Sequence, residues 1–332
     1  AAAPPVEAAG APALEVRDLM VQYQTPAGAG RAVDGVSFTV PTGRVVGLVG
    51  ESGSGKTTLA MALLGLTRSP ARVVAGEVRL NGRDLGRALR SRIAPLRGQE
   101  IALIPQIAMN ALNPAYTAHH QVAEAAALTR PDSAAAAARA TELLELVGIP
   151  AARHRAYPHE LSGGMRQRVV IAMAIANEPS LLIADEPVTG LDVVTQVRIV
   201  DLLLDLRARM DMAILLISHD LPLAAIAADE LLVMYAGRIV EAGASGRVAT
   251  QPAHPYTREL LRGFPSLRGP RERLVAIVGD PPDLLDPPPG CRFHPRCPCA
   301  FDDCARLDPP PVDLVDDHQA ACLLHTPLAV PR

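Results

Sequence analysis

A glycine-rich segment near residue 50 has the residue types and spacing of a phosphate-binding loop. The pattern G-x-x-x-x-G-K-T runs from Gly50 to Thr57, between an apolar run and a helix-like segment. Such a loop turns successive backbone N–H groups toward phosphate oxygens, and the following helix adds its positive end. We expect Lys56 to reach the β- and γ-phosphates and the Thr57 hydroxyl to bind Mg²⁺. The segment therefore predicts a MgATP site formed by Gly50, Glu51, Ser52, Gly53, Ser54, Gly55, Lys56, Thr57 and Thr58.

The lysine content supports this interpretation. Lys56 is the only lysine, and the rest of the 32 basic residues are arginine. A compact ammonium fits between phosphates where a planar guanidinium does not. A glycine-rich turn without function does not explain why the single lysine stands at this position.

An acidic pair provides a second group of candidate residues. Four apolar residues, 181 to 184, lead directly into Asp185 and Glu186. In open α/β sheets, ligands bind at the carboxyl ends of strands. We expect Asp185 to join the Mg²⁺ shell, directly or through water, and Glu186 to polarise the attacking water, because phosphoryl transfer needs mainly positioning and charge neutralisation.

Two further segments fit the same chemistry. The sequence LSGGMRQR, 161 to 168, opens a helical run with a Gly-Gly turn, which predicts a second helix N-terminus directed at phosphate. The sequence LLISHD places His219 just past a buried strand, within reach of a γ-phosphate.

Together these motifs resemble the nucleotide-binding subunit of ABC transporters, over residues 14 to 245 or so. The resemblance implies an α/β fold: a P-loop NTPase cassette with a mixed sheet core, an antiparallel β subdomain and a helical subdomain at about 107–168. It also implies that Tyr23 stacks on adenine and that Gln106 senses Mg²⁺ and touches a membrane partner. His219 is then the switch histidine, a dimer-contact loop contains Leu191 and Asp192, and the signature residues acting on the ATP of a second cassette are Ser162, Gly163, Gly164 and Gln167.

Four positions depart from the family pattern. Pro105 precedes Gln106 where an aromatic residue is usual, Ile107 and Ala108 follow where Asp-Pro is common, and Gly190 replaces the commoner alanine. These departures affect the expected geometry of two coupling loops, and they leave ATP binding untouched.

Strands and helices must position these residues. Short apolar runs alternate with turn residues between 13 and 50, which predicts strands. Alanine-rich helix formers follow from about 118 to 148. Strand-like runs at 181–184 and 214–217 flank a helical pattern at 193–210, which predicts parallel βαβ connections. We expect a flexible tail at 1–12, an ATPase domain at 13–250, and a separate, loop-rich extension at 251–332.

Composition excludes several classes of partner. The formal net charge is −3, so no basic field exists to hold nucleic acid. No apolar run approaches the roughly 18 residues of a membrane span. The Ala/Pro-rich start lacks the pattern of a signal peptide, so we expect a cytoplasmic protein. The resemblance to ABC transporters implies a peripheral position at the cytoplasmic face of the membrane.

The last 42 residues contain all five cysteines. Four thiolates on proline-rich loops can surround one metal centre. Disulfides are disfavoured in a cytosolic chain. Zinc sites usually show more closely spaced cysteines, which makes zinc less favoured without excluding it. An iron–sulfur cluster, a zinc ion and free thiols are therefore the alternatives. The segments AHPYTRELL and GDPPDLLDPPPGCRFHPRC resemble the C-terminal extension of oligopeptide/dipeptide importers. That resemblance implies a [4Fe-4S] cluster on Cys291, Cys297, Cys304 and Cys322, with Cys299 a non-ligand that could substitute for one of them.

The resemblance as a whole implies the ATPase subunit of a peptide importer. Its partners would be a second ATPase subunit, identical or homologous, two permease subunits and, through them, an external peptide-binding protein. An importer of nickel or another small solute is the alternative cargo class. A soluble ABC ATPase of translation or DNA maintenance is disfavoured, because such proteins usually carry two cassettes or a long coiled coil. A redox-regulatory module with residual ATP binding would require that some of the catalytic residues be missing, and all of them are present.

Overall fold

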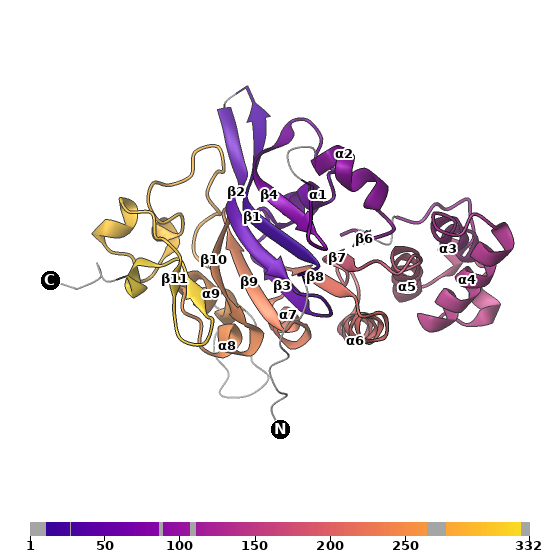
Figure 1. The fold of residues 1–332 in the computed structure, drawn as a ribbon. Coiled ribbons are helices and arrows are strands. Elements are labelled where there is room, and N and C mark those ends of the chain that lie inside the picture. Colours follow the sequence, from indigo (N-terminus) through magenta and orange to yellow (C-terminus); the bar gives the residue numbers. More distant parts are fainter. Residues whose placement is uncertain (1–10, 27, 86–88, 107–110, 264–276, 327–332) are drawn as a thin grey trace. The chain divides into compact units, whose positions relative to one another are not determined.

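The computed structural model describes residues 11–26, 28–85, 89–106, 111–263 and 277–326 (Figure 1). Two compact units divide the chain, and each is built from several segments. The first unit comprises Ala1–Val16, Phe38–Val45 and Glu77–Leu215, and the second comprises Arg17–Ser37, Val46–Gly76 and Leu216–Arg332. We describe the two units in turn.

The second unit contains a mixed sheet that carries the phosphate-binding loop. Strand β3 (Val45–Val49) pairs in parallel with β9 (Glu230–Tyr235), and β9 pairs antiparallel with β10 (Arg238–Ala244). All five residues of β3 are buried, as the continuous apolar run predicts for a strand covered on both faces. The α-helices of this unit include α1 (Lys56–Leu63), α7 (Leu221–Ala227), α8 (Ser245–Thr250) and α9 (Pro255–Arg262).

The C-terminal extension adds strands to this same sheet. Strand β12 (Gln319–Ala320) pairs antiparallel with β10, and β11 (Val312–Asp313) pairs antiparallel with β12. In β10, the buried carboxylate of Glu241 accepts hydrogen bonds from the N–H groups of Ala253 and His254 and lies 2.7 Å from His318 Nε2. The extension is loop-rich, and backbone pairing and a buried polar network join it to β10.

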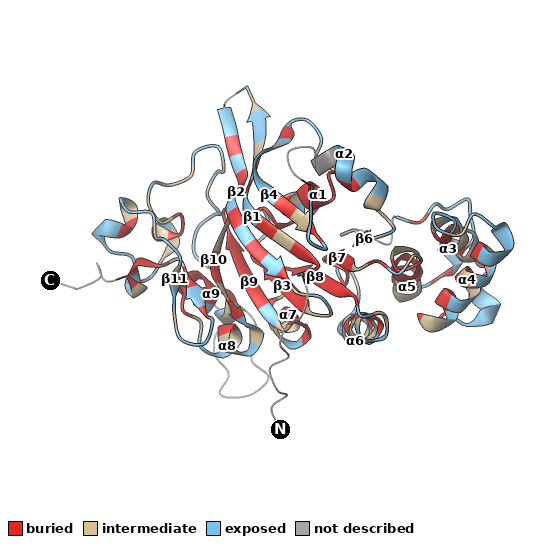
Figure 2. Ribbon diagram, viewed as in Figure 1, coloured by how far each residue is buried: buried red, intermediate tan, exposed pale blue. Residues whose placement is uncertain are grey.

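A four-stranded sheet has the order β2-β1-β4-β5. Its strands are β1 (Leu14–Thr25), β2 (Gly28–Val40), β4 (Ala71–Leu80) and β5 (Arg83–Asp84). Along β2 buried and exposed residues alternate over much of the strand, as Figure 2 shows, because one face of the sheet packs on apolar side chains while the other meets solvent. These strands confirm the expected strand-rich N-terminal segment.

The first unit combines parallel strands with helices. Strand β6 (Ile101–Ile104) pairs in parallel with β7 (Leu181–Asp185), with Ile101 opposite Leu181. The helices are α2 (Leu89–Ile93), α3 (Ala118–Ala126), α4 (Ser133–Leu146), α5 (Gly163–Ala174) and α6 (Val193–Met210), and α3 packs against α4 and α5. Strand β8 (Ala213–Ser218) has residues in both units. The predicted strands at 181–184 and 214–217 and the helix at 193–210 are therefore confirmed.

The alanine-rich stretch forms two helices. Helix α3 ends at Ala126, and α4 begins at Ser133 after Pro131. Proline lacks a backbone N–H, and the Asp132 carboxylate accepts hydrogen bonds from the N–H groups of Ala134 and Ala135, which starts a new helix. Among the described residues, no helix has both the length and the apolar character needed to cross a bilayer.

Candidate functional site

The phosphate-binding loop lies between β3 and α1. Gly50 has φ 155° and Gly55 has φ 107°, values that favour glycine. A Cβ atom on Gly50 would lie 2.2 Å from the carbonyl oxygen of Met234, and one on Gly55 would lie 2.1 Å from that of Ala32. Any side chain at either position would collide with backbone, so the loop can close only with these glycines.

The Lys56 side chain is enclosed by this loop. Its ammonium group donates to the carbonyl oxygens of Gly50, at 2.8 Å, and Glu51, at 2.7 Å, and to Ser54 Oγ at 3.3 Å. Only 5% of Lys56 is exposed. Three short contacts around one point match the three donors of a lysine ammonium. The cation is therefore held where the loop's N–H groups and the first turn of α1 begin, which is the arrangement a phosphate group requires.

Glu51 of the same loop is held by residues that the sequence interpretation missed. Its N–H donates to the Tyr256 hydroxyl at 2.8 Å, and its carboxylate accepts two hydrogen bonds from Arg296, at 2.7 and 2.9 Å. Both partners lie in the C-terminal extension, within the segments AHPYTRELL and HPRC. The sequence marked these segments as unusual, but it carried no signal that they contact the loop.

Tyr23 lies beside α1. Its hydroxyl is 3.3 Å from Thr58 Oγ1, and 37% of the residue is exposed. A partly exposed ring next to the loop's helix leaves an aromatic face accessible to a planar ligand. His219, also in the second unit, is exposed and follows directly on β8. The second unit thus contains the loop, the aromatic residue and the histidine.

The acidic pair lies in the first unit at the end of β7. Asp185 is fully buried. Glu186 has φ 48°, a left-handed conformation that is uncommon for glutamate and costs about 1 kcal/mol. Its carboxylate oxygen Oε2 accepts hydrogen bonds from Gln106 Nε2 and from the Thr189 hydroxyl, both at 3.0 Å. The structure therefore brings Gln106 and Glu186 together, 80 residues apart in sequence.

The residues of the LSGGMRQR segment surround the start of α5. Ser162 caps the helix by accepting a hydrogen bond from the N–H of Met165 at 3.3 Å. A Cβ atom on Gly164 would lie 2.8 Å from Thr195 Cγ2, so α5 and α6 approach each other closely here. Gln167 is buried, and its Nε2 atom has no hydrogen-bond partner among the residues the structure describes.

The loop between β7 and α6 contains two of the remaining expected residues. Asp192 caps α6, and hydrogen bonds from the Thr195 hydroxyl, at 2.7 Å, and the Thr195 N–H, at 3.0 Å, lower the pKa of its carboxyl. Leu191 is half-buried beside it. Gly190, one of the departures from the family pattern, has φ 81°, a conformation that glycine adopts more readily than alanine. Ile107 and Ala108, the other departures after Gln106, lie outside the described residues.

The cysteines surround one pocket in the extension. The pocket has a cavity volume of about 10 Å³, and its lining includes all five cysteines and His254. Burial raises the pKa of Cys291, that of Cys322 to about 11 and that of Cys297 to about 12, so these thiols are protonated near neutrality. No three His, Cys, Asp or Glu side chains in the described part of the chain are grouped closely enough to hold a single metal ion.

His254 adds a polar atom to this lining. It is fully buried, and its Nδ1 accepts a hydrogen bond from the Tyr256 N–H at 3.0 Å. Burial, with a smaller effect of His325, lowers the pKa of His254 to about 3, so the ring is neutral and Nε2 carries the proton. Within the described residues this Nε2 has no hydrogen-bond partner.

Comparison with known proteins places the chain in a family. Residues 33–189 match the ABC transporter model, and residues 240–304 match the oligopeptide/dipeptide transporter C-terminal region. The chain is 46% identical to the dipeptide transport ATP-binding protein DppD of Escherichia coli, over 95% of this chain and 97% of that protein. It is 47% identical to the oligopeptide transport ATP-binding protein OppD of Mycobacterium tuberculosis, over 94% of this chain and 52% of that protein.

The fold agrees with this result. The dimeric post-hydrolysis structure of the ATP-binding cassette MJ0796 bound to ADP and Pi superposes with a TM-score of 0.63, at 24% identity, over 70% of this chain and 98% of that one. At this identity the likeness concerns the fold alone, and it confirms the expected cassette with its mixed sheet. The chain therefore belongs to the ABC transporter family, as an ATPase of the oligopeptide/dipeptide importer group.

Proposed function

We propose that this chain hydrolyses MgATP at a site built on the loop from Gly50 to Thr57 and thereby powers uptake of dipeptides or oligopeptides. The observation that carries the ATP assignment is Lys56: a buried cation held by the carbonyls of a glycine loop at the start of α1. A second cassette, two permease subunits and an external peptide-binding protein are the proposed partners. Identity with peptide-transport proteins over nearly the whole chain supports this choice of cargo over nickel.

Each residue of the site has a proposed task. Lys56 moves from the loop carbonyls to the β- and γ-phosphates when the nucleotide enters, and Tyr23 stacks on the adenine. Thr57, Gln106 and Asp185 would hold Mg²⁺, since hydroxyl, amide and carboxylate oxygens are the ligands that this ion prefers. The ion supplies charge neutralisation at the phosphates. The residues from 50 to 58 bind the phosphates through their backbone N–H groups.

Glu186 is the proposed general base. In the structure its carboxylate is already oriented by Gln106 and Thr189. It accepts a hydrogen bond from the attacking water, while His219 binds the γ-phosphate. The second cassette would cover the other side of the nucleotide with its own Ser162, Gly163, Gly164 and Gln167, and the loop with Leu191 and Asp192 would contact that cassette. ATP then closes two cassettes, and hydrolysis reopens them.

The domain division is also part of the proposal. We assign 13–250 to the ATPase domain, with a helical subdomain at about 107–168, and 251–332 to the extension. Peripheral attachment at the cytoplasmic face of the membrane follows from the proposed permease partners. Co-purification with peptide permeases and their external binding protein, as opposed to nickel permeases, tests the choice of cargo.

We further propose that the cysteine pocket holds a [4Fe-4S] cluster on Cys291, Cys297, Cys304 and Cys322. The donor set of the pocket lining suits a cluster. A single zinc ion would need sulfurs within roughly 4 Å of one another, and no such single-ion group is found among the described residues. The Nε2–H group of His254 needs a hydrogen-bond acceptor in the pocket. A sulfide of a cluster can accept this hydrogen bond, whereas a zinc ion cannot.

The Glu186→Gln substitution tests the ATPase assignment. We expect steady-state turnover to fall by roughly 100-fold or more, because an amide cannot take a proton from water. ATP should remain bound in a closed dimer, measured by retained nucleotide and by light scattering. Glu178→Gln is the matched control, because Glu178 also has a left-handed φ, 55°, and pairs with Arg139 on the surface. Undiminished turnover in Glu186→Gln would refute the role of the carboxylate.

A further inference from the structure

Glu51, the second residue of the phosphate-binding loop, is engaged at each of its polar groups. Its backbone N–H donates to the Tyr256 hydroxyl at 2.8 Å, and its carbonyl accepts from Lys56 Nζ at 2.7 Å. Its carboxylate receives both arms of the Arg296 guanidinium, at 2.7 and 2.9 Å. The contacts of Glu51 therefore connect the loop lysine to two side chains more than 200 residues away in sequence.

These two distant side chains are rigidly held. Tyr256, in α9, is fully buried, and only 6% of the Arg296 side chain is exposed. Tyr256 packs against Tyr235 and Phe293, with ring centroids 4.6 and 5.3 Å apart. Arg296 also donates to the Tyr235 hydroxyl at 3.3 Å. A bidentate guanidinium–carboxylate pair in a buried, aromatic setting fixes both position and orientation.

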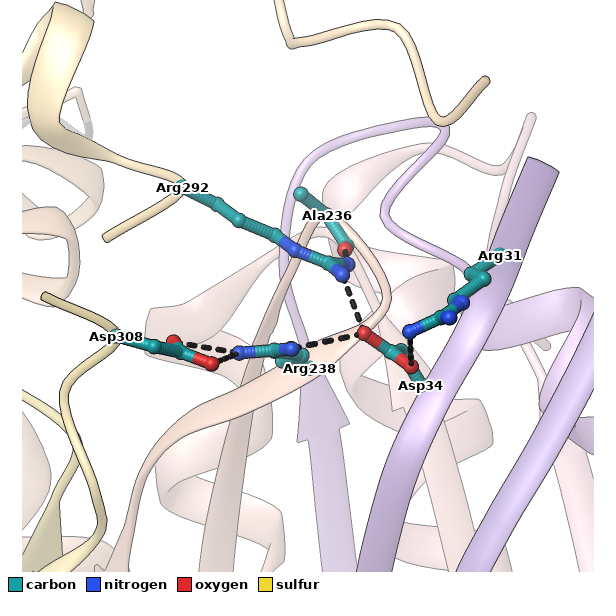
Figure 3. A network of polar contacts seen from close by, with 6 residues as sticks. All are labelled: Arg31, Asp34, Ala236, Arg238, Arg292 and Asp308. Atoms are coloured by element: carbon teal, nitrogen blue, oxygen red, sulfur yellow. Dashed lines mark hydrogen bonds and ion pairs between the residues drawn. The ribbon is translucent and has the colours of Figure 1, made fainter. Parts of the chain in front are cut away.

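The extension is also attached through a polar network that leaves Glu51 untouched. Figure 3 shows Arg292 donating to the Asp34 carboxylate and to the carbonyl of Ala236, while Arg238 bridges Asp34 and Asp308. The Arg238–Asp34 contact measures 2.9 Å. Asp34 is buried, whereas half of the Asp308 side chain is exposed, so Asp308 can be changed with little effect on packing.

We propose that Tyr256 and Arg296 are positioning residues of the ATP site, which act through Glu51. They keep the backbone of Glu51, and with it the loop around Lys56, in the conformation that receives the nucleotide phosphates. Without them the loop must be ordered when nucleotide binds, and that loss of conformational entropy weakens binding. The inference rests on the proposed role of the loop, and it assigns the C-terminal extension a part in nucleotide binding.

Arg296→Ala in the full-length chain tests the proposal. We expect the Kd for the non-hydrolysable MgAMP-PNP, measured by calorimetry, to rise about 5- to 20-fold, the cost of ordering one or two loop residues. The Kd of Arg296→Lys should lie between those of the unmodified chain and Arg296→Ala, because an ammonium restores the charge without the bidentate fork. In the assembled transporter the KM for ATP should rise with kcat changed less than about twofold, since bound nucleotide itself orders the loop.

A double-mutant cycle separates this role from general destabilisation. If Arg296 acts through Glu51, the double variant Glu51→Ala/Arg296→Ala should have a Kd no higher than that of the single variant that binds nucleotide more weakly. Asp308→Asn, the matched control at the other attachment, should bind within about twofold of the unmodified chain. An unchanged Kd in Arg296→Ala, an equal loss in Asp308→Asn, or additive effects in the cycle would each overturn the proposal.

Two more variants complete the test. Lys56→Ala reports on the loop itself: if it binds nucleotide normally, the assignment of the site fails, and if it alone loses binding, only the positioning role fails. Tyr256→Phe removes a single oxygen from the contact to Glu51. It decides the matter should Arg296→Ala not fold: a Kd about 3-fold higher supports the proposal, and an unchanged Kd overturns it.

Discussion

At the scale of single residues, the chain shows why lysine and arginine are not interchangeable. Lys56 makes three contacts within 3.3 Å in a loop that has no room for a Cβ atom at Gly50 or Gly55. Arg296 does the opposite task, since it spreads two N–H groups over both oxygens of Glu51. The compact charge of Lys56 suits binding of the phosphates, and the planar guanidinium of Arg296 suits holding the loop in place.

Lys56→Arg should therefore inactivate the site even though the charge is kept. We expect kcat/KM for ATP to fall roughly 100-fold, as when one electrostatic donor to the transition state is removed. The measurement is steady-state ATP hydrolysis. Arg209→Lys, at an exposed ion pair with Asp205, is the control that should leave turnover unchanged. Near-normal turnover in Lys56→Arg would show that cation shape is unimportant in this loop.

At the scale of elements, local sequence patterns predicted the helices and strands that depend on local interactions. The helix at 193–210 and the strand at 181–184 followed from apolar spacing, and both are present. The alanine-rich stretch was predicted to be helical, and it is, but Pro131 and the Asp132 cap divide it into two helices. The contact between Arg296 and Glu51, 245 residues apart, could not be predicted, because neither periodicity nor spacing reports a tertiary pair.

The close approach of α5 and α6 gives a prediction for these elements. Gly164→Ala puts a methyl group 2.8 Å from Thr195 Cγ2, so we expect the free energy of unfolding to fall by about 1–3 kcal/mol. Urea denaturation measures it. Thr195→Ser in the same chain removes Cγ2 and keeps the hydroxyl that binds Asp192, so it should restore most of the loss. Gly246→Ala, where a Cβ meets nothing within 4 Å, is the control. Equal stability of Gly164→Ala and the unmodified chain would contradict the packing argument.

At the scale of the whole molecule, the extension and the phosphate-binding loop belong to one compact unit. Strands β11 and β12 extend the sheet that contains β3. The cysteine pocket lies next to Arg296 in the chain, since Cys297 follows it directly. We therefore expect a group bound in the pocket to affect the order of the segment that holds Glu51.

The cluster proposal predicts iron and acid-labile sulfide in anaerobically purified protein, with the broad visible absorption of a cluster. Cys322→Ser should lose most of the iron, because Cys322 is a proposed ligand and is buried in the pocket lining, whereas Cys299→Ser should keep it. Removal of the iron should also weaken MgAMP-PNP binding, as Arg296→Ala does, if the cluster orders the segment before Cys297. A colourless protein that contains one zinc ion per chain would contradict the cluster hypothesis. Iron removal without any change in nucleotide affinity would show that Arg296 holds Glu51 independently of the pocket.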